Sequence, residues 1–132
     1  MTSHFTDIFA RTRYAELPGL IASLTERAAE LGIAADDSLR LQLIVEELFT
    51  NTITHGHQGD SEHQVCLALC RNNGVLTLRY EDEAPSFNIS KIEQNTASTA
   101  TVGGLGIGLI RGMCKALRYE RLGSRNVTEI EF

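Results

Sequence analysis

The sequence predicts an α/β two-layer sandwich of the α+β class, with a mixed, mostly antiparallel sheet that carries three helices on one face. The first observation is the order of elements: strand, two helices, two strands, a long irregular segment, a third helix and two closing strands. This order does not repeat the strand–helix–strand unit of a parallel sheet. The second is the length of 132 residues, which suits one domain, residues 1–132, with its own core.

The helical spacing of apolar residues indicates where the helices lie. Apolar residues fall at three- and four-residue steps from Tyr14 to Leu31, and Gly32 follows as a C-terminal glycine. A second helix is expected to begin near Asp36 and to continue to His55. A third is expected over residues 107–117, and its apolar stripe is formed by Ile107, Ile110, Met113, Cys114 and Leu117.

Strands account for the other periodic segments. Residues 4–12 alternate weakly, which suggests an edge strand, and residues 65–70 are apolar throughout, as in a strand covered on both faces. Asn72-Asn73-Gly74 predicts a hairpin turn, and the alternation over 75–81 predicts a returning strand with one buried face. A closing hairpin is expected over 117–122 and 127–132.

Composition excludes several classes of protein. With 42% hydrophobic and 22% charged residues, the chain has the composition of a soluble globular domain. It contains no apolar run of membrane-helix length and no signal segment, so no membrane partner is expected. A net charge of −5 argues against direct nucleic-acid binding. Three cysteines without a secretory signal indicate reduced thiols in the cytoplasm.

A row of polar residues runs along the second predicted helix. Glu47, Asn51 and His55 recur every fourth residue, so they lie beside the apolar stripe and not opposite to it. A carboxylate, a carboxamide and an imidazole are thus expected at the rim of the core, where a site is both dehydrated and reachable. Ordinary polar residues beside a buried face would explain the same pattern. Glu46 lies well round the helix from Glu47 and is expected in solvent.

A glycine-rich segment precedes the third predicted helix. Gly103, Gly104, Gly106 and Gly108 expose backbone amides at a helix N-terminus, where anions bind. A flexible hinge would have the same composition. The segment is not a Walker A motif, because no Gly-Lys-Ser/Thr follows, and no strand precedes it as a Rossmann fingerprint requires. Between Asp82 and the first of these glycines periodicity is lost, and such long irregular segments are often functional lids.

Three segments together resemble the N, G1 and G2 boxes of the GHKL ATPase superfamily, which has the Bergerat ATP-binding fold. These segments are residues 46–56, 81–87 and 103–109. The chain resembles most the bacterial anti-sigma-factor serine/threonine kinases, and the resemblance extends over nearly its whole length. It implies the same two-layer sandwich as the order of elements.

The resemblance implies a role for individual residues. Asn51 matches the Mg²⁺ ligand, Glu47 the general base, and Asp82 the aspartate that accepts a hydrogen bond from the adenine amino group. His55 is expected in a structural or phosphate-edge contact. Ala84 stands where the family has glycine, so its methyl is expected to crowd the adenine or disallow the glycine φ angle. The other expected nucleotide contacts are Phe87, Gly103, Gly104, Leu105, Gly106, Ile107 and Gly108.

The resemblance also implies a function. A protein of this type would bind ATP and Mg²⁺, phosphorylate an anti-anti-sigma (STAS-type) antagonist, and sequester a sigma factor when free of it. Whether the protein forms a homodimer is left open by the resemblance. Two alternatives are a nucleotide-binding switch with weak or no catalysis, which Ala84 favours, and an ATP-hydrolysing regulator with another output. The intact pair of Glu47 and Asn51 favours the enzyme.

Rival sites fit the sequence poorly. Cys66 and Cys70 lie four residues apart on one expected strand, about 13 Å, which is too far for a disulfide. The four residues that a zinc site would use match no common zinc spacing: His55, His57, His63 and Cys66.

Overall fold

The computed structural model describes residues 6–86, 110 and 112–132. Its strands are β1 (Thr6–Arg11), β2 (Gln64–Asn72), β3 (Val75–Asp82), β4 (Ala116–Leu122) and β5 (Arg125–Glu131). Its α-helices are α1 (Leu17–Glu30) and α2 (Ala35–Asn51). A 3₁₀ turn, η1 (Tyr14–Glu16), precedes α1, and a π-helical turn, η2 (Thr52–His57), follows α2.

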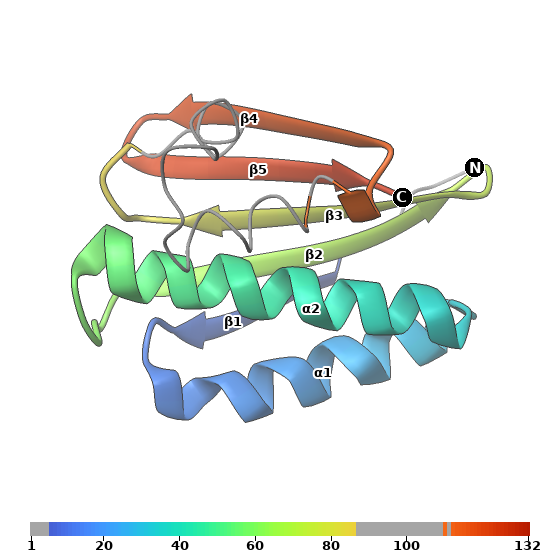
Figure 1. Ribbon diagram of the computed structural model, residues 1–132, viewed down its shortest axis with the longest axis horizontal. Helices are drawn as coiled ribbons and strands as arrows, with labels where there is room; N and C mark the ends of the chain where they lie inside the picture. Colours follow the sequence, from blue (N-terminus) through green and yellow to red (C-terminus); the bar gives the residue numbers. More distant parts are fainter. Residues whose placement is uncertain (1–5, 87–109, 111) are drawn as a thin grey trace.

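The five strands form one sheet in the order β1-β2-β3-β5-β4, and every pairing in it is antiparallel (Figure 1). The prediction of a mixed sheet is therefore wrong. The reason is where β5 lies. The connection after β3 brings β4 back in the same direction as β3, but β5 lies between these two strands and separates them. The expected edge position of the first strand is confirmed, because β1 pairs only with β2 among the described strands.

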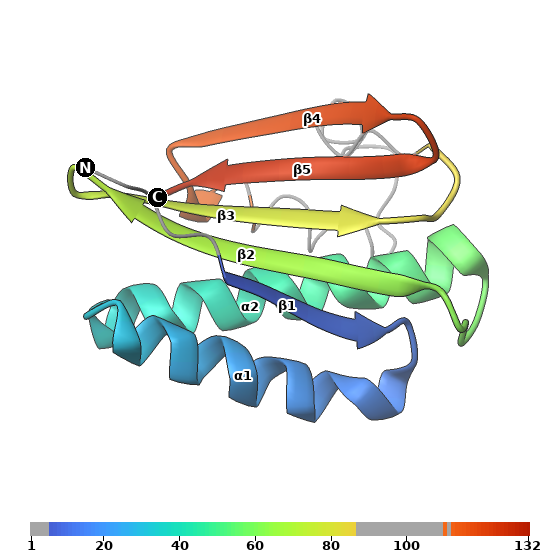
Figure 2. The same cartoon turned by 180° about the vertical axis from the view of Figure 1, so that it is seen from behind.

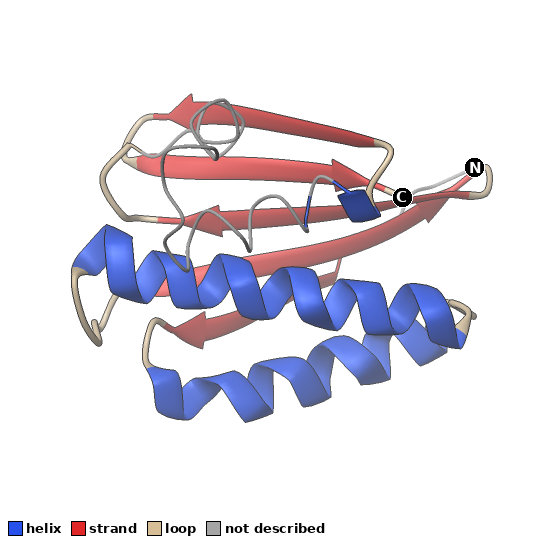
Figure 3. Ribbon diagram, viewed as in Figure 1, coloured by secondary structure: helices blue, strands red, loops and turns tan. Residues whose placement is uncertain are grey.

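Both α-helices cover the same face of the sheet, and within the described residues the other face carries no helix (Figures 2 and 3). The alternation of β3 is as predicted: Leu76, Leu78 and Tyr80 are buried under the helices. The turn before β3 is a tight hairpin with positive φ at Asn73 and Gly74, as the sequence indicates. The largest fully buried side chains are Leu24, Leu41, Ile44, Phe49, Ile53, Leu67, Leu69, Leu78, Tyr80, Ile110 and Ile130.

The expected count of three helices is not matched by the described residues, which contain two α-helices. Of the predicted third helix, Ile110, Gly112 and Met113 are helical, and Ile110 is buried in the core. The prediction also extends this helix too far. Leu117 lies in β4 and pairs with Ile130, because its apolar side chain satisfies a strand position as well as a helical stripe.

The second helix also ends earlier than predicted. α2 stops at Asn51, and the chain widens into the π-helical turn before it leaves the layer of helices. Gln58 then adopts the left-handed conformation, and the backbone N–H of Gly59 donates to the carbonyl oxygen of Ile53. π-turns are rare and occur often at functional sites. Within the described residues, no helix is long and apolar enough to cross a membrane.

Candidate nucleotide-binding site

The polar row on α2 is divided by burial. Asn51 is buried, with 7% of its surface exposed, whereas His55 on the π-helical turn is exposed. Glu47 is half-buried and its neighbour Glu46 is exposed, as the helical spacing predicts. The three residues of this row therefore differ in their exposure to solvent, with Asn51 the most buried and His55 the most exposed.

The carboxylate of Glu47 is made more basic by its surroundings. Partial burial raises its pKa, and this effect outweighs the opposing influences of the nearby Asn51 and His55 side chains. The carboxamide of Asn51 lies close enough to lower the pKa, yet its Nδ2 makes no hydrogen bond of ordinary length and angle. A carboxylate with a raised pKa is a better proton acceptor than one in water.

Asp82, at the end of β3, is held by donors on both carboxylate oxygens. Oδ2 accepts from the Thr52 hydroxyl at 3.0 Å, and the Tyr80 hydroxyl lies 2.7 Å from the same Thr52 oxygen. Oδ1 accepts from the backbone N–H of Ala84 at 3.0 Å. These contacts tie the loop after β3 to the first residue of the π-helical turn.

The sequence alone did not single out Asn126 and Arg121, which hold this loop from the other side. Nδ2 of Asn126, a residue 3% exposed, donates to Oδ1 of Asp82 at 2.8 Å and to the carbonyl oxygen of Ala84 at 3.0 Å. Arg121 donates to the same carbonyl at 2.8 Å and to Oδ1 of Asn126 at 3.0 Å. One signal was available: Asn126 has the same strand parity as Thr128 and Ile130, so it faces the core.

A narrow pocket lies between α2, η2 and the end of the sheet. Its volume is about 20 Å³, which is room for a water molecule and not for a purine. Adenine could enter only if the groups around the pocket moved apart. Asn51 is a pocket residue, and its buried Nδ2 makes no hydrogen bond of ordinary length and angle to the described residues. The lining residues are Leu48, Asn51, Thr52, Gly56, Tyr80, Asp82, Ala84, Asn126 and Thr128.

Ala84, which replaces the usual glycine, is accommodated by Gly56. Its φ angle is not positive, so the expected backbone strain is absent at this residue. Its methyl group is buried and faces the bare backbone of Gly56, where an added Cβ would lie only 2.7 Å away. The methyl nevertheless lines the pocket, so crowding of adenine stays a prediction.

The structure therefore brings Asn51, Asp82 and Ala84 into one pocket, with Glu47 one helical turn from Asn51. His55 is exposed and does not line this pocket. The remaining predicted nucleotide contacts, Phe87 and Gly103 to Gly108, lie outside the described residues.

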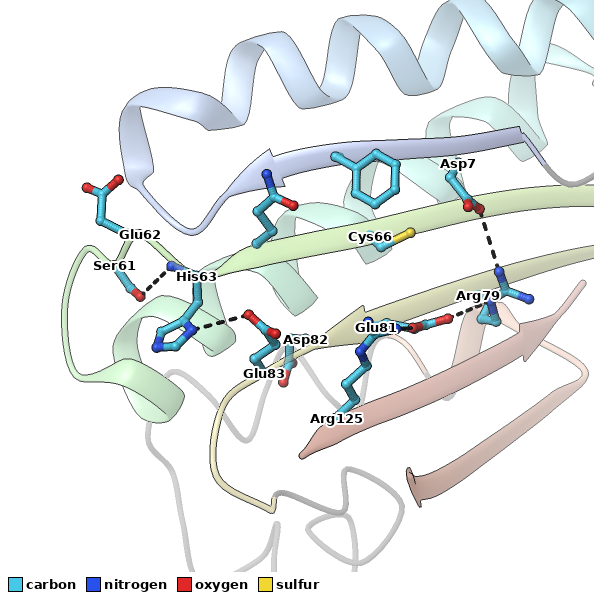
Figure 4. A pocket seen from close by; sticks show the side chains of 12 residues that line it. Asp7, Ser61, Glu62, His63, Cys66, Arg79, Glu81, Asp82, Glu83 and Arg125 are labelled. Atoms are coloured by element: carbon cyan, nitrogen blue, oxygen red, sulfur yellow. Dashed lines mark hydrogen bonds and ion pairs between the residues drawn. The ribbon is translucent and has the colours of Figure 1, made fainter. Parts of the chain in front are cut away.

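A wider hollow, of about 590 Å³, lies on the helix-free face of the sheet (Figure 4). Its charged side chains are largely paired with one another: Arg79 contacts Asp7 and Glu81, and Nδ1 of His63 lies 3.2 Å from Glu83. The His63 ring also stacks on His57 at a centroid distance of 4.9 Å. Within the described residues, no three side chains of the metal-binding types are arranged to hold an ion.

A five-stranded antiparallel sheet with helices on one face, and a polar pocket where α2 meets the end of β3, defines the α+β class of the histidine kinase-like ATPases. The sequence matches the family model described as "Histidine kinase-like ATPase domain" over residues 10–132, and the chain belongs to this family. Domains of this family bind ATP, usually with Mg²⁺. Membership supports an ATP-binding, kinase-type function for this chain.

Among solved structures, the chain is similar to the histidine kinase domain from the Erythrobacter litoralis EL346 blue-light activated histidine kinase, with a TM-score of 0.56 and 17% identity. The similarity covers 89% of this chain and 59% of that one, so this chain spans less than two thirds of its length. At this identity the likeness shows the fold. No match to the sequence is found among curated proteins.

Proposed function

We propose that the chain is an Mg-ATP-dependent serine/threonine protein kinase that acts as an anti-sigma regulatory factor. One observation carries the nucleotide site: Asn51 is 7% exposed, its Nδ2 makes no hydrogen bond of ordinary length and angle to the described residues, and it shares a pocket with Asp82. A buried polar group without a partner is costly for a fold. Its presence supports a role toward a bound ligand.

Asp82 is suited to recognise an amino group. Each carboxylate oxygen has two acceptor positions. Among the described residues, Oδ1 uses both positions, for Ala84 N–H and Asn126, whereas Oδ2 accepts from Thr52 alone. One acceptor position on Oδ2 is therefore left for the adenine amino group.

The α2 residues are suited to the phosphate end of the ligand. Asn51 offers a neutral oxygen ligand for Mg²⁺, which takes oxygen ligands and retains several waters. Glu47, with its raised pKa, accepts the proton of the attacking serine or threonine hydroxyl. Bound Mg-ATP supplies the phosphoryl group that is transferred.

The partners follow from the resemblance to anti-sigma-factor kinases. The phosphate acceptor is proposed to be an anti-anti-sigma (STAS-type) antagonist, and the chain sequesters a sigma factor when that antagonist is absent. A homodimer is compatible with this scheme. The net charge of −5 is in keeping with protein partners and not nucleic acid.

Calorimetric titration with ATP and Mg²⁺ tests the nucleotide site. The wild type is expected to bind ATP only weakly without Mg²⁺. Asn51→Ala should lose most of the Mg²⁺ dependence, and Asp82→Asn should weaken binding of ATP more than that of pyrophosphate. Ser38→Ala, on the far end of α2, is the control. Absence of ATP binding in a folded wild-type protein would refute the proposal.

The second candidate is a non-catalytic switch that works by competition between partners. The observation that favours it is the methyl of Ala84 in a pocket of about 20 Å³, because both restrict adenine. A wild-type protein that binds the sigma factor and the antagonist but never transfers phosphate would establish the switch and exclude the kinase.

A further inference from the structure

A second hollow, which we call the distal pocket, lies at the end of the molecule opposite the nucleotide pocket. α2 and β3 both begin beside it and end near Asn51 and Asp82 (Figure 1). At 1.5 Å per residue, the 17 residues of α2 separate the two sites by ~25 Å. Its volume is about 580 Å³, and it is lined by Gly32, Ile33, Ala34, Asp37, Arg40, Arg71, Gly74, Leu76, Gly112, Met113, Cys114, Lys115 and Phe132.

The charged side chains of the distal pocket are mostly cationic. Arg40, Arg71 and Lys115 line it together with a single acidic side chain, that of Asp37. This local excess of positive charge occurs in a chain of net charge −5. All three cations line the pocket and are exposed to solvent.

The cations are only lightly used by the protein itself. Arg40 contacts Asp37 at 3.2 Å in an exposed ion pair, which is a weak interaction. Nη1 of Arg71 donates to the carbonyl oxygens of Leu31 and Gly32, which positions its guanidinium without neutralising it. Lys115 makes no side-chain ion pair within the described residues.

The rest of the lining is apolar. Ile33, Met113 and Phe132 are partly buried and pack against the core, and Leu76 belongs to the core itself. Such a surface can cover an apolar side chain of a ligand while the exposed cations, which form the rim of the pocket, pair with carboxylates. An inorganic anion would use the rim and leave the apolar part bare. A nucleic acid would need a longer track of cations than these three.

We propose that the distal pocket docks an acidic segment of a partner protein, in which carboxylates flank an apolar side chain. Charge complementarity selects the acidic partner, and the apolar lining selects the residue between the acids. The inference does not depend on the nucleotide site, because the two pockets share no lining residue.

Fluorescence anisotropy with a short, labelled peptide of alternating glutamate and leucine tests the proposal on the full chain. Two matched peptides carry glutamine or lysine in place of glutamate. Only the acidic peptide should bind, and its affinity should fall when NaCl is raised from about 0.05 M to about 0.5 M. Amide chemical shifts should change around residues 32–40, 71–76 and 112–115, and not at Asn51 or Asp82.

The double variant Arg40→Glu/Lys115→Glu should lower the affinity for the acidic peptide by roughly tenfold or more. The control is Arg118→Glu, because the Arg118 side chain is 54% exposed and ion-paired, against 51% for Arg40. It should bind the peptide as the wild type does. Met113→Ser should weaken binding without changing its salt dependence. Unaltered ATP binding in all variants separates this site from the nucleotide pocket.

The proposal is overturned if the glutamine peptide binds as tightly as the acidic one, if the double variant binds like the control, or if the shifts lie elsewhere. It is also overturned if no peptide binds to the folded wild type. A far-ultraviolet spectrum and thermal unfolding of each variant confirm that it is folded.

Discussion

Glu47 and Asn51 are one helical turn apart, yet burial gives them different chemistry. Asn51 is neutral and its desolvation has already occurred on folding, so it can face a metal or phosphate in the ground state without a further loss of hydration. Glu47 is half-buried and its pKa is raised, so its proposed role in phosphoryl transfer depends on its ability to accept a proton. In the proposed kinase, binding and transfer therefore respond to different residues.

Glu47→Gln should leave ATP affinity nearly unchanged and should lower phosphoryl transfer to the antagonist by roughly 10²–10⁴. The amide retains the shape and hydrogen bonding of the carboxylate, but it cannot accept the proton. An ATP titration paired with a phosphorylation assay measures both quantities. Glu46→Gln is the matched control, since Glu46 is the exposed neighbour. Equal transfer by wild type and Glu47→Gln would show that Glu47 is not the base.

The raised pKa of Glu47 also sets a pH dependence. The transfer rate should fall on acidification with a midpoint above the ordinary glutamate pKa of 4.5, because protonation removes the base. The effect on stability has the opposite sign. Because the pKa of Glu47 is higher in the folded than in the unfolded state, its carboxyl group stabilises the fold below the unfolded pKa, and this stabilisation is lost as the pH rises through the folded pKa. Glu47→Gln should thus be slightly more stable than wild type at neutral pH. A transfer midpoint at or below the unfolded value would contradict the prediction.

At the scale of elements, the π-helical turn η2 and the loop after β3 fit each other through Gly56 and Ala84. A Cβ on Gly56 would lie 2.7 Å from Cβ of Ala84, which is far inside normal contact distance. Gly56 has no positive φ, so alanine is disfavoured there by packing and not by backbone conformation. The two positions are therefore expected to be coupled.

Gly56→Ala should destabilise the fold by about 1–3 kcal/mol, which is the usual effect of overpacking. Gly56→Ala/Ala84→Gly should recover most of this loss, because the second change removes the methyl that clashes. Urea unfolding of the wild type, both single variants and the double variant gives the coupling free energy. Additive effects of the two changes would show that the methyl groups do not meet.

The hairpin of β4 and β5 holds the same loop through Asn126. Asn126→Ala would remove the donor to Oδ1 of Asp82 and should lower stability by about 1–3 kcal/mol. ATP affinity should also fall, measured at a temperature where both proteins are fully folded. Arg125→Ala, on the same hairpin, is the control, because Arg125 pairs with Glu81 on the helix-free face. Unchanged ATP affinity would limit Asn126 to a structural role.

Local patterns predicted most of the elements but few of the contacts between them. The alternation of β3 and the stripe on α2 are properties of neighbours in the chain, so they can be recognised in the sequence. The position of β5 between β3 and β4 depends on which strand fits beside β3 after a long connection. Asn126 could not be assigned a role, because its partners Asp82 and Ala84 lie more than forty residues away.

At the scale of the whole molecule, one face of the sheet is covered by α1 and α2, and no described helix lies on the other face (Figure 2). Near the nucleotide pocket, the bare side of the sheet is linked to the helices by the stacked rings of His57 and His63. These residues lie in the turn after α2 and in the segment before β2. Global stability is therefore expected to respond to the protonation of His57.

Partial burial is the main effect that lowers the pKa of His57 below the ordinary histidine value of 6.5, and the neighbouring His63 lowers it further, despite opposing effects of Asp82 and Glu83. The folded state then binds fewer protons than the unfolded state, so stability should fall as pH drops from about 6.5 to the folded pKa. The expected loss is a few tenths of a kcal/mol, because the ring is only partly buried.

Urea unfolding of wild type and His57→Gln between about pH 7.5 and about pH 5 measures this effect, since titration of an ordinary histidine falls in that window. The difference in unfolding free energy between the two proteins should shift in favour of His57→Gln as pH falls. A difference that does not vary with pH would show that the stacked pair does not resist protonation and that acid sensitivity arises from other groups.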